Sequence, residues 1–377
     1  MLPNELTREE QTVLVLSKPF LRENEIKDMK QLLFEQQDWN LILGMLHVHR
    51  TAGIAWKNIK EHAIHLRKEF KATYFLKSLE IMYKGQLETA MDNIKFNDVL
   101  FKALDQHGIV YGIVKGSVVG EWAYGDVGLR LFGDNDLFIS QEQLHNTEAV
   151  LKNLGYIQGS WNYETQTVTP AKRSEILYLI MNSHQTYTYM KPSLECRFMD
   201  CHRIDVQFSV DLMSGNRTHE IVRDMLERRI QTTIANHYPV WTLKEEDMLL
   251  FLCIHFYKEA IYLSEVKAMK DLLLYKLLDI YGLFLKENML DVTLFVKRTK
   301  DYGFEKMVYF AFHYVNEVFP NTISADVMDE LRPVSLTYLS EVFDTSEVVH
   351  TWDQPIVKRF FHINRSLDIQ QSPVNKE

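Results

Sequence analysis

The stretch VKGSVVGEWAYGDVGLRLFGDNDLFIS, residues 114–140, decides the fold of this chain. A β-rich run ending in Lys115, Gly116 and Ser117 precedes a second such run, which carries Asp134 and Asp136. Side chains alternate along a strand, so the two aspartates are expected on one face. Neighbouring carboxylates are costly to hold together unless a cation neutralises them, and such oxygen ligands suit Mg²⁺ or Mn²⁺ rather than zinc.

The turn at Gly116 and Ser117 provides a backbone able to approach a phosphate closely and a hydroxyl to donate to it. It is not a P-loop, because the chain has no G-x-x-x-x-G-K-[ST] motif. A third carboxylate, Asp205, lies on the polar face of the alternating run RIDVQFSV, residues 203–210. Two aspartates joined by a third from a neighbouring strand form the ligand set that two-metal phosphoryl transfer needs. The residues therefore predict metal-dependent chemistry on a triphosphate.

The region around this motif combines strand-like and helix-like sequence patterns. Glycines cluster between about residues 105 and 133, and short β-rich runs continue to about residue 212. Strands are expected at residues 109–114, 137–139, 176–180 and 204–210. One helix is expected to begin at Ser140, which with Gln143 has the spacing of a capping box, and to end before Gly155.

Helical periodicity dominates on both sides of this region, from about residue 24 to residue 95 and from 216 to about 343. The fold class expected is α+β, with a central mixed sheet and its helices flanked by N- and C-terminal helical regions. The expected division is an N-terminal helical region at 1–96, a catalytic core at 97–215, a C-terminal helical domain at 216–365 and a flexible tail at 366–377.

Composition limits the partners of the chain. A net charge of −9 over 377 residues argues against nucleic acid or an acidic membrane as a binding surface. The longest apolar stretch, residues 248–257, is shorter than the roughly 20 residues of a bilayer span. The N-terminus is polar and acidic, and three cysteines suit a reducing compartment. These features predict a cytosolic protein without a membrane partner.

The Gly-Ser pair, the Asp-x-Asp motif and the later hydrophobic-Asp-hydrophobic strand resemble the DNA polymerase beta-like nucleotidyltransferase superfamily. More closely, the Lys-Gly pair followed by YGD-x-GLR-x-x-GD-x-D is similar to a bacterial nucleotidyltransferase family often found in gene clusters for peptide natural products. The likeness extends over about residues 30–290. Two positions depart from the family pattern, Val114 in place of Leu and Asn135 in place of an apolar residue, and neither removes a ligand.

The resemblance implies a role for each residue of the motif. Gly116 and Ser117 would hold the β- and γ-phosphates, and Asp134 and Asp136 would bind Mg²⁺ or Mn²⁺. Asp205 would complete the second metal site and act as, or assist, the general base. An NTP, ATP among the candidates, would give its NMP to an oxygen of a small-molecule or peptide acceptor, with release of pyrophosphate.

Two basic residues flank the acids, and both are candidates for neutralising triphosphate charge. Lys115 also fits an exposed lysine at the end of a strand. Arg130 also fits an ion pair with one of the aspartates or with Asp126. His184 is expected to be a structural histidine, with the rim of the site as the alternative position.

Other polar residues in apolar surroundings have structural interpretations. Cys196, Cys201 and His202 lack the spacing and the fourth ligand of a zinc site. Asp279 lies within an apolar helical run, which predicts a buried, hydrogen-bonded or ion-paired carboxylate.

Two other functions remain open at this point. A catalytically silent nucleotide- or peptide-binding partner protein would keep most of the same motif. Nucleotidyl transfer to RNA or to another protein would use the same acids, although the acidic charge balance argues against RNA.

Overall fold

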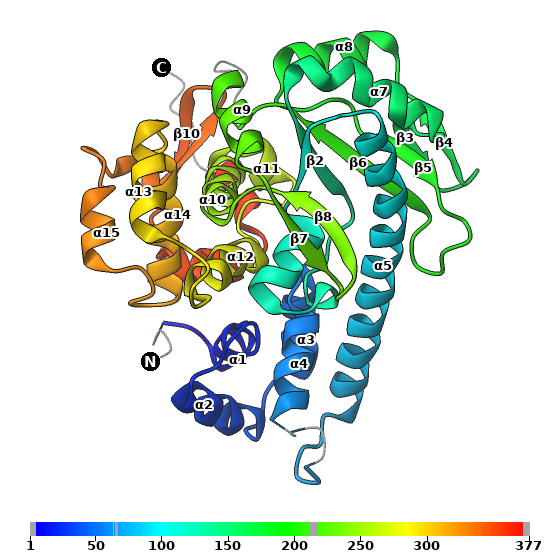
Figure 1. Ribbon diagram of the computed structural model, residues 1–377. Coiled ribbons are helices and arrows are strands. Elements are labelled where there is room, and N and C mark those ends of the chain that lie inside the picture. The colour runs from blue at the N-terminus through cyan, green and yellow to red at the C-terminus, as the bar shows by residue number, and fades with distance from the viewer. Residues whose placement is uncertain (1–4, 63, 65–66, 211–217, 372–377) are drawn as a thin grey trace. The chain divides into compact units, whose positions relative to one another are not determined.

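The computed structural model describes residues 5–62, 64, 67–210 and 218–371. It confirms the α+β class, with a large mixed sheet and flanking helices (Figure 1). The contacts divide the chain into two compact units. The sheet unit is Met82–Met248, and the helical unit combines Met1–Ile81 with Leu249–Glu377. The first and last parts of the chain thus share one unit, and its limits differ from the boundaries expected at residues 96, 215 and 365.

Eight strands form the sheet: β1 (Tyr111–Val114), β2 (Asn135–Ile139), β3 (Ile157–Asn162), β4 (Thr167–Pro170), β5 (Tyr189–Pro192), β6 (Cys201–Gln207), β7 (Ile230–Ile234) and β8 (Tyr238–Thr242). Their order is β4-β3-β5-β6-β2-β1-β8-β7. β2 is antiparallel to β1 and parallel to β6, and β1 is parallel to β8. Every residue of β1 and β2 is buried, so the motif lies at the centre of the sheet.

The helices of the sheet unit connect these strands. They are α6 (Gly116–Val119), the π-helix η2 (Gly120–Tyr124), the 3₁₀ turns η3 (Val127–Leu129) and η4 (Gln141–Gln143), α7 (Leu144–Asn153), α8 (Arg173–Asn182) and α9 (His219–Glu227). The long helix α5 (Thr73–Gln106) contributes its residues from Met82 onward, and Figure 1 shows it running beside the sheet. Its apolar positions continue the 3.6-residue pattern expected for this region.

The helical unit contains α1 (Arg8–Leu16), α2 (Glu23–Leu33), α3 (Trp39–Val48), α4 (Ala52–Glu61), most of α10 (Glu245–Ile261), α11 (Leu263–Lys267), α12 (Leu274–Leu285), α13 (Val292–Asp301), α14 (Glu305–Val318), α15 (Ala325–Glu330), η5 (Thr337–Ser340), the hairpin β9 (Glu341–Asp344) and β10 (Glu347–Thr351), α16 (Ile356–Phe361) and α17 (Arg365–Gln371). Aromatic rings fill its core: Phe310 stacks on Tyr314 at 4.2 Å, and Phe256 meets both rings within 6 Å. Asp279 is buried within α12, as its apolar surroundings predicted.

The C-terminal segment differs from the flexible tail expected from residue 366. α17 covers Arg365–Gln371, while residues 372–377 lie outside the described part of the chain. The buried guanidinium of Arg365 donates to both carboxylate oxygens of Asp271 at 2.6 Å. Ile369 packs in a cluster with Val266 and Trp352. These two anchors explain why a polar sequence is ordered here.

The strand expected at residues 176–180 is wrong, because this run forms the middle of α8. A short continuous apolar run fits a strand or a helix equally well, and its flanking residues decide between them. Here the Glu175 carboxylate accepts from the backbone N–H of Lys172, which starts a helix. No residue of α8 is buried, so its apolar residues do not have the burial that a central strand would give them.

Three further local expectations have mixed outcomes. The helix after β2 does end before Gly155, whose φ of +86° requires a glycine-like conformation, but Ser140 makes no side-chain cap and the first turn is 3₁₀. β6 ends at Gln207 rather than at residue 210. The hairpin β7–β8 was expected to be helical. Its three-residue loop has positive φ at Ala235 and Asn236 and contains no glycine.

Within the described ranges, no helix combines the length and the hydrophobicity that crossing a membrane requires.

The anchor of α17 predicts a measurable stability effect. Arg365→Ala leaves the Asp271 carboxylate buried without its partner, a change that costs about 3–5 kcal/mol in buried pairs. We expect the midpoint of thermal unfolding to fall by several degrees, measured by calorimetry, whereas Arg332→Ala, at an exposed position of the same unit, leaves it unchanged. An unchanged midpoint in Arg365→Ala would show that the pair contributes no net stability.

Candidate active site

The turn after β1 is the most strained backbone of the site. Lys115 has φ +58° and ψ −135°, and Gly116 follows with φ +43°. Two consecutive residues with positive φ redirect the chain from the strand into α6, and for a lysine this conformation costs on the order of 1–3 kcal/mol. Ser117 is buried in the first turn of α6. The central strand thus ends at Val114, before the Lys115-Gly116-Ser117 end expected from the sequence, and the Gly-Ser pair begins α6.

Asp136 and Asp205 lie side by side on neighbouring parallel strands. In the register of the sheet Asp136 is opposite Val114 on β1 and Asp205 on β6. Asp136 is buried, and its Oδ1 accepts from the Lys115 ammonium at 3.5 Å and from the Gln207 amide. The structure therefore brings two of the three expected acids together at the centre of the sheet.

Burial raises the pKa of Asp136 to about 7, against the opposing effect of the Lys115 ammonium. The negative charges of Asp134 and Asp205 add to the rise, and Arg130 counteracts it. Burial and the charge of Asp134 likewise raise the pKa of Asp205 to about 6. Asp136 and Asp205 are thus both destabilised in their ionised forms by burial and by the charge of Asp134, which is the behaviour expected of carboxylates that share a site.

Asp134 directly precedes β2 and is exposed, unlike its two neighbours. Its charge acts on both of them, so it lies within their electrostatic reach. Thr188, just before β5, donates its hydroxyl to Asp205 at 2.6 Å. In this arrangement no three His, Cys, Asp or Glu side chains of the described residues are gathered closely enough to hold a metal ion.

The donor set nevertheless suits a hard divalent cation. Its ligands would be carboxylate oxygens, and the repulsion between Asp136 and Asp205 is the energy that a cation would relieve. Lys115 currently supplies part of that neutralisation. The chemistry of the residues therefore fits Mg²⁺ or Mn²⁺.

The two basic residues proposed beside the acids are both buried. Lys115 is 8% exposed and pairs with Asp136, so the alternative of an exposed lysine is wrong. Arg130 is 6% exposed, and its charge lowers the pKa of Asp136. Asp126 instead accepts from the Tyr83 hydroxyl at 2.6 Å and from a backbone N–H. The charge of Arg130 therefore acts on Asp136, one of the candidate acids.

Asn135, between the two aspartates, uses the opposite face of β2. Its amide donates to Asn93 Oδ1 at 2.9 Å and to the backbone carbonyl of Arg203 at 3.1 Å, and its Oδ1 accepts from Asn97 at 2.7 Å. Asn93 and Asn97 lie one turn apart on α5. This buried network fastens β2 to α5 and β6. The sequence showed Asn135 only as a departure from an apolar pattern, and the partners on α5 carried no signal.

His202 belongs to the same buried network rather than to a metal site. Its ring contacts the Asn135 amide at 3.2 Å and the Tyr156 hydroxyl at 2.8 Å, and it stacks on Phe96. Burial lowers its pKa to about 3, so the ring is neutral. The sequence-based rejection of zinc at Cys196, Cys201 and His202 agrees with this position.

Gln207 and Thr188 contact the acids and were not identified from sequence. Gln207 shares the polar face of β6 with Asp205, and this two-residue spacing was the available signal. Thr188 lies on a different strand connection, with no such signal. His184 is buried beside β6, where its backbone carbonyl accepts from Phe208 at 2.9 Å.

Comparison with known proteins places the chain among the nucleotidyltransferases, which are enzymes of nucleotidyl transfer. It belongs to the family described as an uncharacterised nucleotidyltransferase, whose model matches residues 35–320. No curated protein and no solved structure matches the chain. The matched segment contains every residue of the acidic site described above.

The Asn135 network predicts a stability effect separate from catalysis. Asn135→Ala leaves the amides of Asn93 and Asn97 and the His202 ring without a shared partner, and each unsatisfied buried group costs about 1–3 kcal/mol. We expect a loss of at least about 2 kcal/mol in urea unfolding. Asn153→Ala, at an exposed position on α7, is the matched control, and equal stability of the two variants would contradict the network's importance.

The raised pKa of Asp136 predicts a pH-dependent gain in stability for Asp136→Asn. A carboxyl whose pKa rises on folding, here from 3.8 to about 7, stabilises the fold while protonated and loses that contribution as pH rises between these values. An amide has no such loss. The unfolding midpoint of Asp136→Asn relative to the wild type should therefore be higher at pH 8 than at pH 5. Asp200→Asn, at an exposed position, should show no such trend, and a falling difference for Asp136→Asn would refute the assignment.

Proposed function

We propose that this protein transfers an NMP from an NTP to an oxygen of a small-molecule or peptide acceptor and releases pyrophosphate, in a reaction that depends on Mg²⁺ or Mn²⁺. The observation that carries the proposal is the register of the central strands. Asp136 and Asp205 are direct neighbours on β2 and β6, and Asp134 directly precedes β2. Membership of a nucleotidyltransferase family supports the general activity.

Each residue of the site has a part in this mechanism. Asp134, Asp136 and Asp205 would hold the divalent ions, which supply charge neutralisation for the triphosphate and activation of the acceptor hydroxyl. Asp205 would accept the proton of the acceptor hydroxyl while the oxygen of that hydroxyl bonds to the α-phosphorus. The bond from the α-phosphorus to the bridging oxygen breaks, and pyrophosphate leaves with the electron pair. The pKa of Asp205, raised to about 6, lies close enough to neutral pH for this role.

The Gly116–Ser117 turn and the side chains of Lys115 and Arg130 would hold the phosphates. Positive φ at Lys115 and Gly116 turns the backbone sharply at the strand end, next to the acids. Lys115 and Arg130 would neutralise phosphate charge in the low-dielectric interior, where the effect of a charge is larger than in water. Most of the catalysis would then be positioning and charge neutralisation.

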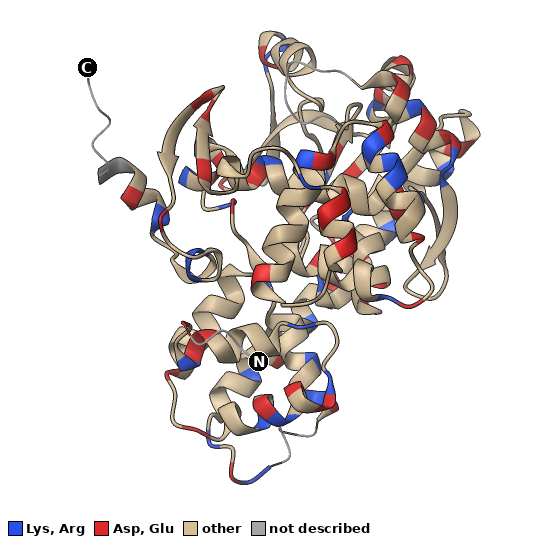
Figure 2. Ribbon diagram, turned by 90° about the vertical axis from the view of Figure 1, so that its left-hand side faces the viewer, with Lys and Arg blue, Asp and Glu red and all other residues tan. Residues whose placement is uncertain are grey.

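The finer classification belongs to the same proposal. We propose that the sheet is a polymerase beta-like nucleotidyltransferase core, on the basis of its Gly-Ser turn and its acids on adjacent strands. A peptide or small molecule is the acceptor to test first, because the resembling family is found near peptide natural-product genes. Figure 2 shows acidic and basic residues interspersed on the helices it displays, which gives no support to RNA as the acceptor.

A specific observation favours one second candidate, a catalytically silent nucleotide- or peptide-binding protein. Asp136 is engaged by Lys115 and Gln207, and the three acids are not gathered into a metal-holding group within the described ranges. A lysine that permanently replaces the metal ion would produce this arrangement. The two candidates differ in one measurable property, turnover in the presence of divalent ions.

The test combines nucleotide binding with turnover. Thermal unfolding is measured with ATP, GTP, CTP or UTP, each with and without Mg²⁺, because a ligand near a hundred times its Kd contributes about 2.7 kcal/mol and raises the midpoint by several degrees. Pyrophosphate release is then measured with the stabilising nucleotide and a panel of hydroxyl-bearing small molecules and peptides. We expect Asp134→Ala, Asp136→Ala and Asp205→Ala each to lower release by about 10²-fold or more.

Asp200→Asn serves as the control that removes a carboxylate outside the site and is expected to keep full activity. Activity retained in any two of the three alanine variants would refute the proposed site. Mg²⁺-dependent nucleotide binding without release of pyrophosphate for any acceptor would favour the silent binding protein.

A further inference from the structure

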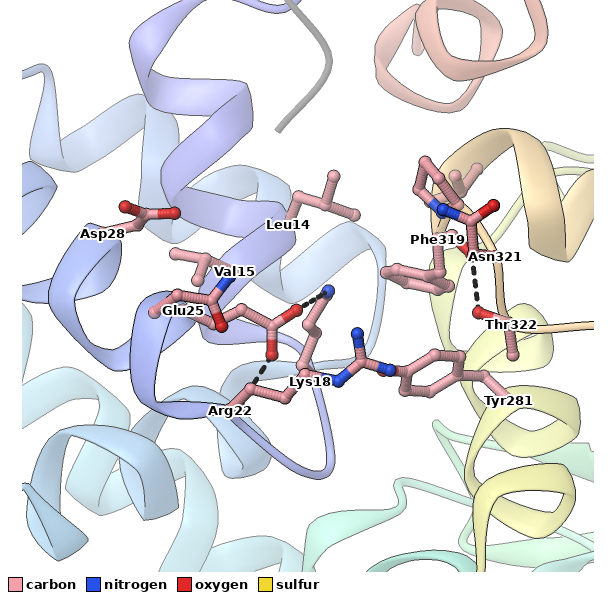
Figure 3. Close-up of a pocket in the computed structure, with 13 residues that line it drawn as sticks. Leu14, Val15, Lys18, Arg22, Glu25, Asp28, Tyr281, Phe319, Asn321 and Thr322 are labelled. Carbon is pink, nitrogen blue, oxygen red and sulfur yellow. Dashed lines mark hydrogen bonds and ion pairs between the residues drawn. The ribbon is translucent and has the colours of Figure 1, made fainter. Parts of the chain in front are cut away.

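A lysine lies against aromatic rings in two pockets of the chain, and the two lysines differ in how their charge is met. In the helical unit, Lys18 Nζ lies 5.1 Å from the ring centre of Phe319 and 5.9 Å from that of Tyr281. The Glu25 carboxylate is 2.5 Å from the same nitrogen, so the protein itself neutralises this charge (Figure 3). In the sheet unit, no carboxylate of the described residues forms an ion pair with Lys191.

The pocket at Lys191 has a volume of about 280 Å³ and is mainly apolar on its inner side. Its lining comes from α5, from the loop before β3, and from β5 with the segment that follows it. The inner residues are buried or half-buried, and they are Phe96, Leu100, Leu154 and Tyr156. Exposed residues line the outer part, and they are Lys95, Val99 and Glu195.

The aromatic walls of this pocket are fixed by one buried ring. His202 stacks on Phe96 with ring centres 5.1 Å apart, and its Nδ1 is 2.8 Å from the Tyr156 hydroxyl. His202 also contacts the Asn135 amide, so both walls belong to the network that holds β2. The pocket is therefore preformed.

The pocket lies on the face of the sheet opposite the acids. Lys191 on β5 is paired directly with His202 on β6, and directly paired residues of neighbouring strands point to the same face. Asp205 follows His202 by three residues on β6, so its side chain points to the other face. A ligand in this pocket therefore makes no use of the proposed nucleotidyl-transfer site.

The ammonium of Lys191 has hydrogen-bond donors that the protein does not use. Its Nζ lies 5.8 Å from the ring centre of Phe96 and 5.7 Å from that of Tyr156, and the side chain is half-buried. Ring faces attract the positive charge but provide no oxygen for the three N–H groups. Within the described ranges no side chain or carbonyl accepts a hydrogen bond from this ammonium. A ligand oxygen would meet this need.

The charges at the outer part of the pocket favour a ligand with a single negative charge. The Lys95 ammonium is engaged by Asp92 at 2.9 Å, which leaves Lys191 as the cation available to a ligand. Glu195 is exposed and lines the same pocket. A second negative charge on the ligand would meet repulsion from Glu195 without a second cation to offset it.

We infer that this pocket binds an apolar monocarboxylate, with the ligand carboxylate at Lys191 and its apolar body against Phe96 and Leu154. A cavity of about 150 Å³ accommodates benzene, so a pocket of nearly twice that volume suits a ligand of about ten non-hydrogen atoms. Octanoate and 3-phenylpropanoate have this size and represent a flexible chain and an aromatic ring. The inference does not depend on the proposed function.

The test titrates the full chain with octanoate and with 3-phenylpropanoate by calorimetry, without nucleotide. We expect saturable binding of at least one of these acids at a single site. The amide of each acid keeps the apolar body and removes the charge, and it should bind at least about tenfold more weakly. Octylamine inverts the charge and should show no saturable binding.

Variants of the pocket complete the test, with thermal unfolding as the check that they fold. Lys191→Gln should weaken binding of the acid by about tenfold or more and leave binding of its amide unchanged, so that acid and amide bind alike. Leu154→Trp fills the pocket and should abolish binding of both. Lys152→Gln removes a charge from an exposed position of α7 that does not line the pocket, and it should bind as the wild type does.

Four results would overturn the inference. They are the absence of saturable binding for both acids, equal binding of acid and amide to the wild type, unchanged binding of the acid in Lys191→Gln, and unchanged binding of the acid in Leu154→Trp.

Discussion

The burial of Asp136 beside Asp205 is the constraint on which the rest of the sheet unit depends. Two carboxylates at adjacent positions of central parallel strands are buried in a medium of low dielectric constant, which raises the pKa of both, and the charge of Asp134 adds to each rise. Four surrounding side chains stabilise the ionised carboxylates: the cations Lys115 and Arg130, and the neutral hydrogen-bond donors Gln207 and Thr188. The mixed pairing of the sheet is what brings these groups to one place, because β1 delivers the cation and β6 delivers the second acid.

β2 serves two purposes with alternating side chains. Asp134 and Asp136 belong to one face, while the Asn135 amide is bound on the other face by α5 and His202. A satisfied amide network is directional, so it fixes the position of the strand more narrowly than an apolar side chain would. The strand that carries the aspartates on one face is therefore held by hydrogen bonds on its other face as well as along both edges.

The acids, the Gly-Ser turn and the strands that carry them could be predicted, because a two-residue alternation and a glycine turn are local properties of the sequence. The run at 176–180 could not be assigned, since five apolar residues fit either a strand or a helix until Glu175 caps one. Contacts such as Thr188 with Asp205, or Asn97 with Asn135, depend on which elements become neighbours. Nothing in the spacing of these residues indicates that pairing. The order of α17 depends likewise on Asp271, 94 residues away from Arg365.

The raised pKa of Asp136 also has a consequence for how the sequence changes over generations. Asparagine, one base change away, would remove the cost of ionising a buried carboxyl as pH rises, but it would also take this carboxylate away from the buried Lys115 ammonium. The buried lysine and the buried carboxylate therefore each limit the replacement of the other. This chain still carries all three acids and the strained lysine beside them.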